Sequence, residues 1–277
     1  TSATGDDWHR RLLLECGDII DYLVVHKYFG FNGVTAVAEN TVRRVINDIE
    51  RFGDPSRHKI LFTEYNTAWI TDRRDWNKNT SISSAVTVGD YIIRMMYYPQ
   101  VIEADFHCLN TSGGDQERIF VNGTWKTSLF YPSDGGPWWA FYVDTDKKVK
   151  PTAPVDVLKL FYDNIDGAKV IGCDYEDFEL GKGAQSTALA MQQKNGDICL
   201  FITNFDMEKD LKINLENTGY YLKEDTVIYG TNGQYSMNFK DKNEVMVDKH
   251  THKDTSECSS YTVPEMSFAM IRLSPAD

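Results

Sequence analysis

The stretch Lys59-Ile60-Leu61-Phe62-Thr63-Glu64-Tyr65-Asn66 decides how this chain is interpreted. β-prone residues run directly into a carboxylate, which is typical of a buried strand whose C-terminal end opens into the mouth of a (β/α) barrel. An isolated glutamate at a strand end more often forms a salt bridge or faces water. Glu64 becomes a candidate catalytic residue because two other strand-like runs end in polar side chains at similar intervals.

Those two runs are residues 19–28 and 101–110, and helix-like segments separate the three predicted strands. The helix-like segments carry apolar residues at intervals of about 3.6 residues, which is one turn of an α-helix. The order β-α-β-α-β-α, with a repeat of about forty residues, is typical of (β/α) barrels and of doubly wound sheets. The predicted helices span residues 37–52, 82–98 and 155–165, and the polar residues at the strand ends are His26, Tyr28, Glu64, Asn66, His107 and Asn110.

The pattern changes after Gly167 to short strands without a helical stripe. Asn195-Gly196 is a strong hairpin signal between two of these strands. This half of the chain therefore predicts an antiparallel β-sandwich packed against the first half. The predicted strands span residues 187–191, 198–204, 211–215, 226–229 and 267–273.

The composition excludes some classes of partner. The net charge is −12 and no basic stripe is present, which argues against nucleic acid and anionic membranes as partners. No apolar run is long enough to span a membrane, and nothing at the N-terminus resembles a signal peptide. The five cysteines lack C-x-x-C spacing, and His250-Thr251-His252 has no third ligand nearby in the sequence, so we expect no metal site and interpret this pair as an exposed loop.

Aromatic residues make up 13% of the chain, and several tryptophans, Trp69 among them, follow predicted strand ends. Exposed rings at a barrel mouth can stack on sugar faces, although large rings also fill the cores of loops. Three N-glycosylation sequons begin at Asn79, Asn110 and Asn122. They favour a secreted or extracellular glycoprotein.

Together these segments resemble family 51 of the glycoside hydrolases, the retaining α-L-arabinofuranosidases. Glu64-Tyr65-Asn66, with Trp69 after it, resembles the nucleophile strand of that family, whose usual form is Glu-Trp-Asn. Residues 21–28 resemble the sixth barrel strand, which ends His-x-Tyr. Residues 88–110 resemble the helix and eighth strand that follow the nucleophile, and residues 263–273 are similar to the last strand of the family's sandwich.

The resemblance implies an α/β partial TIM barrel followed by an all-β antiparallel sandwich. Residues 1–166 would form the last three βα units of a (β/α)8 barrel, and residues 167–277 the sandwich. The implied activity is retaining hydrolysis of terminal arabinofuranosyl residues of plant-type polysaccharides or oligosaccharides, without a metal or organic cofactor. Glu64 would be the nucleophile, and the expected substrate-binding residues are His26, Tyr28, Asn66, Trp69 and His107.

The chain departs from the family pattern in three respects. Tyr65 replaces the family's tryptophan, and His107 falls nearest to the position of a sugar-binding glutamine. Barrel strands one to five are absent, and with them the Asn-Glu motif that supplies the acid/base. A retaining mechanism needs two carboxylates about 5–5.5 Å apart. No second carboxylate of this chain ends a strand in a comparable way, the candidates being Asp72, Asp75, Glu103 and Asp105.

We therefore expect an N-terminal chain or segment of the same enzyme as a partner, and a homo-oligomer is also compatible with the sequence. Two alternatives remain open. The chain is either a non-catalytic structural or carbohydrate-binding glycoprotein on a glycosidase scaffold, or a related barrel enzyme that cleaves β-xylosides or glucuronides.

Overall fold

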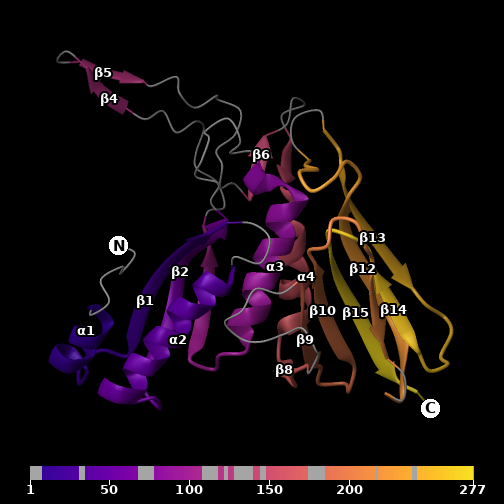
Figure 1. Ribbon diagram of the computed structural model, residues 1–277, viewed down its shortest axis with the longest axis horizontal. Helices are drawn as coiled ribbons and strands as arrows, with labels where there is room; N and C mark the ends of the chain where they lie inside the picture. The colour runs from indigo at the N-terminus through magenta and orange to yellow at the C-terminus, as the bar shows by residue number, and fades with distance from the viewer. Residues whose placement is uncertain are drawn as a thin grey trace.

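The computed structural model describes residues 8–30, 35–67, 78–107, 118–121, 124–127, 140–143, 148–173, 185–215, 218–238 and 242–276. It shows a parallel sheet and a large antiparallel sheet, with two helices packed between them (Figure 1). The elements of the first part are α1 (Trp8–Cys16), β1 (Tyr22–Phe29), α2 (Thr35–Phe52), β2 (Lys59–Thr67), α3 (Ile82–Met96), β3 (Val101–Phe106) and α4 (Ala153–Ile165).

Strands β1, β2 and β3 form a parallel sheet in that order, as the β-α-β-α-β repeat predicts. Side chains alternate across β1, so that Leu23 and Val25 are buried while Tyr22 and Val24 are more than 45% exposed. The buried face packs against α2 and α3 through Val42, Val45, Ile49, Val88 and Tyr91. The other face of the sheet carries the exposed side chains of β1.

The three predicted helices are confirmed, with ends that shift by up to two residues. The predicted first strand begins three residues later than expected, because residues 17–19 form a turn after α1. Helix α1 was not predicted. It buries only His9 and Leu13, so its apolar stripe is short.

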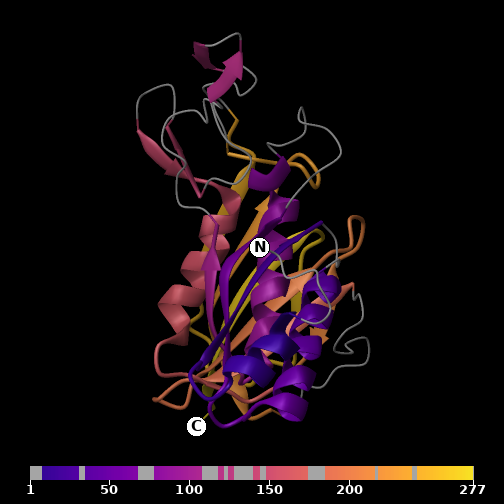
Figure 2. The same ribbon diagram turned by 90° about the vertical axis from the view of Figure 1, so that its left-hand side faces the viewer.

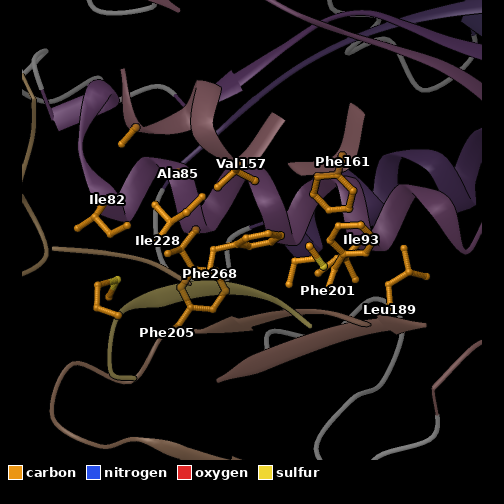
Figure 3. Close-up of a cluster of buried hydrophobic side chains, with 14 of the residues drawn as sticks. Ile82, Ala85, Ile93, Val157, Phe161, Leu189, Phe201, Phe205, Ile228 and Phe268 are labelled. Atoms are coloured by element: carbon orange, nitrogen blue, oxygen red, sulfur yellow. The ribbon is translucent and has the colours of Figure 1, made fainter. Parts of the chain in front are cut away.

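Helices α3 and α4 lie against the antiparallel sheet through a second core (Figure 3). Figure 3 shows Val157 and Phe161 of α4, Ala85 of α3, and Phe201 and Phe268 of the sheet around this core. The rings of Phe161 and Phe201 stack with centroids 4.4 Å apart. Figure 2 views the molecule from the side of the parallel sheet, with α4 running alongside that sheet.

Gly89 permits a close approach between α3 and this sheet. A Cβ at that position would lie 2.4 Å from the ring of Phe268, which is fully buried, so a side chain there would force the core to shift.

The antiparallel sheet has six strands in the order β13-β12-β15-β10-β9-β8, and a two-stranded sheet, β11-β14, covers its far face. Both faces are buried: Cys199 and Phe201 of β10 face the helices, while Leu200 and Ile202 face the second sheet. The strands are β8 (Lys169–Val170), β9 (Ser186–Gln192), β10 (Ile198–Asn204), β11 (Leu211–Asn214), β12 (Tyr220–Gly230), β13 (Val245–Thr251), β14 (Ser260–Val263) and β15 (Ser267–Pro275).

The five predicted strands of this half are confirmed, and the Asn195-Gly196 turn joins β9 to β10 with Gly196 at a φ of +90°. Strand β12 begins six residues before its predicted start, and β8, β13 and β14 were not predicted. Two small antiparallel sheets were also missed, β4 (Arg118–Val121) with β5 (Thr124–Thr127) and β6 (Phe141–Val143) with β7 (Val149–Pro151).

An ion-pair network is buried between α2 and α3. The guanidinium of Arg94 contacts Asp90 at 3.0 Å and Glu39 at 2.7 Å, and all three side chains are fully buried. Tyr98 donates a 2.6 Å hydrogen bond to the other oxygen of Glu39. Burial raises the pKa of Asp90, whereas Arg94 acts in the opposite direction. Among the described residues, no helix is long and apolar enough to cross a membrane.

Candidate active site at the ends of the parallel strands

A β-bulge in β2 places Glu64 opposite His26. Val25 of β1 pairs with Phe62, but the next residue, His26, pairs with Glu64, so β2 has one extra residue at this point. The pairing with β3 shifts at the same place, between Phe62 and Tyr65. As a result Phe62 and Tyr65 are both buried on the helix side, although they are three residues apart. Bulges of this kind occur next to active sites, where they redirect a side chain.

Two side chains of β1 contact the carboxylate of Glu64. The hydroxyl of Tyr28 donates a 2.8 Å hydrogen bond to Oε2, and Nδ1 of His26 lies 3.4 Å from the same oxygen. The side chain of Glu64 is 34% exposed and that of His26 is 27% exposed. The carboxylate is therefore held by the protein while still accessible from solvent.

The surroundings of Glu64 favour its ionised form. The hydrogen bond from Tyr28 lowers the pKa of Glu64 most, and the nearby imidazoles of His26 and His107 lower it further. Burial alone would raise the pKa of Glu64, but its effect is smaller than that of these contacts together. A carboxylate that is ionised, oriented and accessible can act as a nucleophile.

His107 lies beside this pair, as its position after β3 predicts. Its backbone N–H donates to the carbonyl of Tyr65 at 3.0 Å, and its ring meets that of Tyr28 edge-on with centroids 6.0 Å apart. The structure therefore brings together Glu64, His26, Tyr28 and His107, which come from three different strands or strand ends. Trp69 lies outside the described residues, as do Asn110 and the candidate carboxylates Asp72 and Asp75.

Asn66 supports this arrangement from within the protein. Its Nδ2 donates a 2.5 Å hydrogen bond to the carbonyl of His107, and its Oδ1 accepts one of 2.6 Å from the N–H of Thr67. The side chain is fully buried. Its amide therefore connects the ends of β2 and β3.

Two hydroxyl contacts in this region were not predicted. Thr63, the residue before Glu64, places Oγ1 2.8 Å from Nε2 of His26. At the end of β2, the hydroxyls of Thr67 and Ser84 lie 2.6 Å apart and attach the strand to α3. Serine and threonine near a strand end were the only signal in the sequence, and that signal is too common to identify such pairs.

The two histidines of the His250-Thr251-His252 motif share one carboxylate partner. His250 belongs to β13 and lies 3.2 Å from a carboxylate oxygen of Asp225, while His252 contacts the other oxygen at 2.5 Å. The interpretation of this pair as an exposed loop was therefore wrong for His250. Within the described part of the chain, no group of three His, Cys, Asp or Glu side chains is arranged to hold a metal ion. The side chain of Asn79, the first residue of one sequon, is buried.

No protein-family model matches the sequence. No curated protein matches it either. Solved structures do match the fold. The family 51 arabinofuranosidase of Xanthomonas axonopodis pv. citri is similar at a TM-score of 0.68 and 14% identity, over 98% of this chain and 56% of that one.

Two further structures are similar. The α-L-arabinofuranosidase of Thermotoga maritima, solved as an arabinose complex, gives a TM-score of 0.69 and 15% identity, over 97% of this chain and 56% of that one. A family 44 xyloglucanase of Paenibacillus polymyxa gives a TM-score of 0.53 and 14% identity, over 97% of this chain and 51% of that one. The chain thus spans about half the length of these enzymes. It shares its fold with the corresponding part of the α-L-arabinofuranosidases.

Proposed function

We propose that this chain carries the nucleophile of a retaining glycoside hydrolase that removes terminal α-L-arabinofuranosyl residues. The observation that carries the proposal is the contact of Tyr28 and His26 with one oxygen of Glu64, at 2.8 and 3.4 Å, at the carboxyl ends of parallel strands. Active sites of (β/α) barrels lie at this end of the strands. The similarity of the fold to α-L-arabinofuranosidases supports the choice of sugar.

In the proposed reaction, an oxygen of Glu64 attacks the anomeric carbon while the bond to the leaving oxygen breaks. An acid/base group donates its proton to that oxygen, and the sugar remains bound to Glu64 as an ester. The same group then takes a proton from water, which attacks the anomeric carbon and releases Glu64. Both protons and both bonds are accounted for without a metal or an organic cofactor.

The contacts in the structure suggest a role for each neighbour. Tyr28 and His26 keep Glu64 ionised and oriented, and their exposed edges would meet the sugar bound there. His107 would donate to a sugar hydroxyl. Asn66 would act through His107, because its amide is buried. Trp69 would offer a ring for stacking near the same strand end.

The acid/base group would come from a polypeptide segment or chain outside these 277 residues. In this proposal residues 1–166 form the last three βα units of a (β/α)8 barrel and residues 167–277 form the accompanying sandwich. Two features support a partner along β3, which is an edge of the sheet. Ile102 of β3 is 53% exposed, and an apolar groove of about 440 Å³ lies between β3, α3 and α4, with Leu158 and Ile165 in its lining.

A non-catalytic role is the second candidate. It is favoured by the sequence, in which no second carboxylate ends a strand as Glu64 does. A scaffold of this kind would still bind sugar through the aromatic and polar side chains around Glu64.

The proposal is tested on the protein isolated from its natural source. Intact mass and peptide sequencing, with and without reductant, would show whether further barrel strands accompany this chain. The purified material would then be assayed with an aryl α-L-arabinofuranoside. Release of the aryl alcohol by material that contains the additional strands supports the proposal. If those strands are present and arabinofuranosides bind without being cleaved, the non-catalytic role is correct.

A further inference from the structure

We propose that Thr63 is a positioning residue, whose hydroxyl fixes which nitrogen of His26 faces Glu64. The catalytic consequence of this inference rests on the proposed function, but the positioning itself does not. It follows from the bulge in β2, which brings two consecutive residues of that strand, Thr63 and Glu64, to the same side chain of β1.

The two ring nitrogens of His26 have different partners. Nε2 lies 2.8 Å from Oγ1 of Thr63, and Nδ1 lies 3.4 Å from Oε2 of Glu64. The imidazole is thus held at both nitrogens by neighbouring residues of one strand. A rotation of the ring by about 180° would place carbon atoms at both positions and lose both contacts.

Glu64 selects the tautomer of His26, and Thr63 holds the ring in the orientation that presents Nδ1 to Glu64. Glu64 is ionised and can only accept a hydrogen bond, so Nδ1 must carry a proton for its contact to be attractive. In neutral His26 the other nitrogen, Nε2, then has no proton and needs a donor. A threonine hydroxyl supplies one, and it can instead accept a hydrogen bond if the imidazole becomes doubly protonated. Valine at this position would fill the same space without either capacity.

This arrangement would matter for Glu64 in two ways. A proton fixed on Nδ1 adds to the effect of Tyr28 in favouring the carboxylate over the acid. It also restrains Oε2, which both His26 and Tyr28 contact, so the position of the imidazole contributes with Tyr28 to the orientation of the carboxylate. Second partners of this type fix the orientation of functional histidines in many sites.

The test uses the 277-residue chain labelled with 15N-histidine. Long-range 1H–15N spectra distinguish the two neutral tautomers, and the signals of His26 are identified among the six histidines by their loss in His26→Gln. We expect neutral His26 to be protonated at Nδ1 in the wild type and in Thr63→Ser. Thr63→Val removes the contact that holds Nε2, so the imidazole can turn away from Glu64 and the share of His26 protonated at Nδ1 should fall in favour of the Nε2-protonated form.

Thr262→Val is the matched control, because Thr262 is an exposed threonine in β14. It should leave the His26 signals unchanged. Thr63→Ala repeats the test with a smaller side chain if the valine variant fails to fold, which the signals of the other histidines would reveal. An Nε2-protonated wild type, or identical His26 signals in wild type, Thr63→Val and Thr63→Ala, would overturn the inference.

Activity gives a separate readout if the assembled protein is a glycosidase. Thr63→Val should then lower kcat about tenfold, the usual effect of losing about 1.4 kcal/mol in the transition state, with little change in KM. Thr63→Ser keeps the hydroxyl and should retain most of the wild-type kcat. Absence of any glycosidase activity would count against the proposed function, whereas the tautomer of His26 would still decide the role of Thr63.

Discussion

The hydroxyl of Tyr28 donates a 2.8 Å hydrogen bond to Oε2 of Glu64, across two neighbouring parallel strands. This bond is the main cause of the lowered pKa of Glu64. A lowered carboxyl pKa means that the interaction stabilises the folded chain above the ordinary pKa of glutamate. The stabilisation is lost as the pH falls through the lowered value. Tyr28 therefore connects the stability of the strand ends to the charge of the candidate nucleophile.

Replacing Tyr28 by phenylalanine should raise the pKa of Glu64, because the donor to its charged form is removed. The change can be followed by 13C NMR titration of the Glu64 carboxyl. In an active assembly, the acidic limb of the pH–rate profile should move to higher pH. The value of kcat/KM should fall by a factor of about 10 to 100, since hydrogen bonds to charged groups contribute roughly 1.5–3 kcal/mol.

Tyr22→Phe provides the comparison for this variant, since Tyr22 is an exposed tyrosine on the same strand. It should leave the titration of Glu64 as it is. An unchanged or lower pKa of Glu64 in Tyr28→Phe would show that the hydrogen bond does not control the charge of this carboxylate.

Glu64→Gln should remove nearly all turnover, by about a thousandfold or more, as expected when a group that takes part in bond formation is lost. The fold should persist, because the side chain is 34% exposed and the amide oxygen can still accept from Tyr28. Circular dichroism and kinetics on the same preparation check both points. Glu50→Gln, on the exposed side of α2, should be fully active. Substantial turnover by Glu64→Gln would exclude Glu64 as the nucleophile.

Asn66→Asp tests the connection between β2 and His107. The carboxylate can still accept from the N–H of Thr67, but it cannot donate to the carbonyl of His107. The free energy of unfolding of this variant should be about 1–3 kcal/mol lower than that of the wild type, which is the usual cost of leaving a buried polar group without its hydrogen bond. Urea denaturation measures this difference, and Asn47→Asp on the exposed side of α2 is the control. Equal stability of the two variants would contradict the supporting role of Asn66.

Arg94→Met tests the buried network beneath the parallel sheet. Removal of the guanidinium leaves the carboxylates of Asp90 and Glu39 buried without their cation, which should cost about 3–5 kcal/mol of folding free energy. Arg11→Met removes an exposed i,i+4 pair with Glu15 and should cost less than about 1 kcal/mol. A similar loss in the two variants, measured by urea denaturation, would show that the network contributes little.

The sequence predicted the parallel strands and their order because each is an apolar run followed by a helix with a clear 3.6 periodicity. It also predicted that His26, Tyr28, Glu64 and His107 would lie together, since the carboxyl ends of parallel strands meet at one edge of a sheet. The strands β10 and β15 were recognisable because both their faces are buried.

The bulge at Thr63 could not be predicted, because register depends on the pairing between strands and leaves no local signature in β2. The buried position of Asn66 depends on the same register. Strand β13 was missed because most of its side chains are exposed, as in the run Lys249-His250-Thr251. This strand forms by pairing antiparallel with β12, and the sequence of β13 alone does not indicate that pairing.

The central claim, that Glu64 is a glycosidase nucleophile, is tested most directly by covalent labelling. The native assembly is treated with an arabinofuranose-configured epoxide, which traps a carboxylate that attacks the anomeric position, and is then digested and sequenced by mass spectrometry. We predict one sugar adduct on the peptide that contains residues 59–67, located on Glu64, and none in Glu64→Gln. An adduct on a different carboxylate, or equal labelling of Glu64→Gln, would contradict the account.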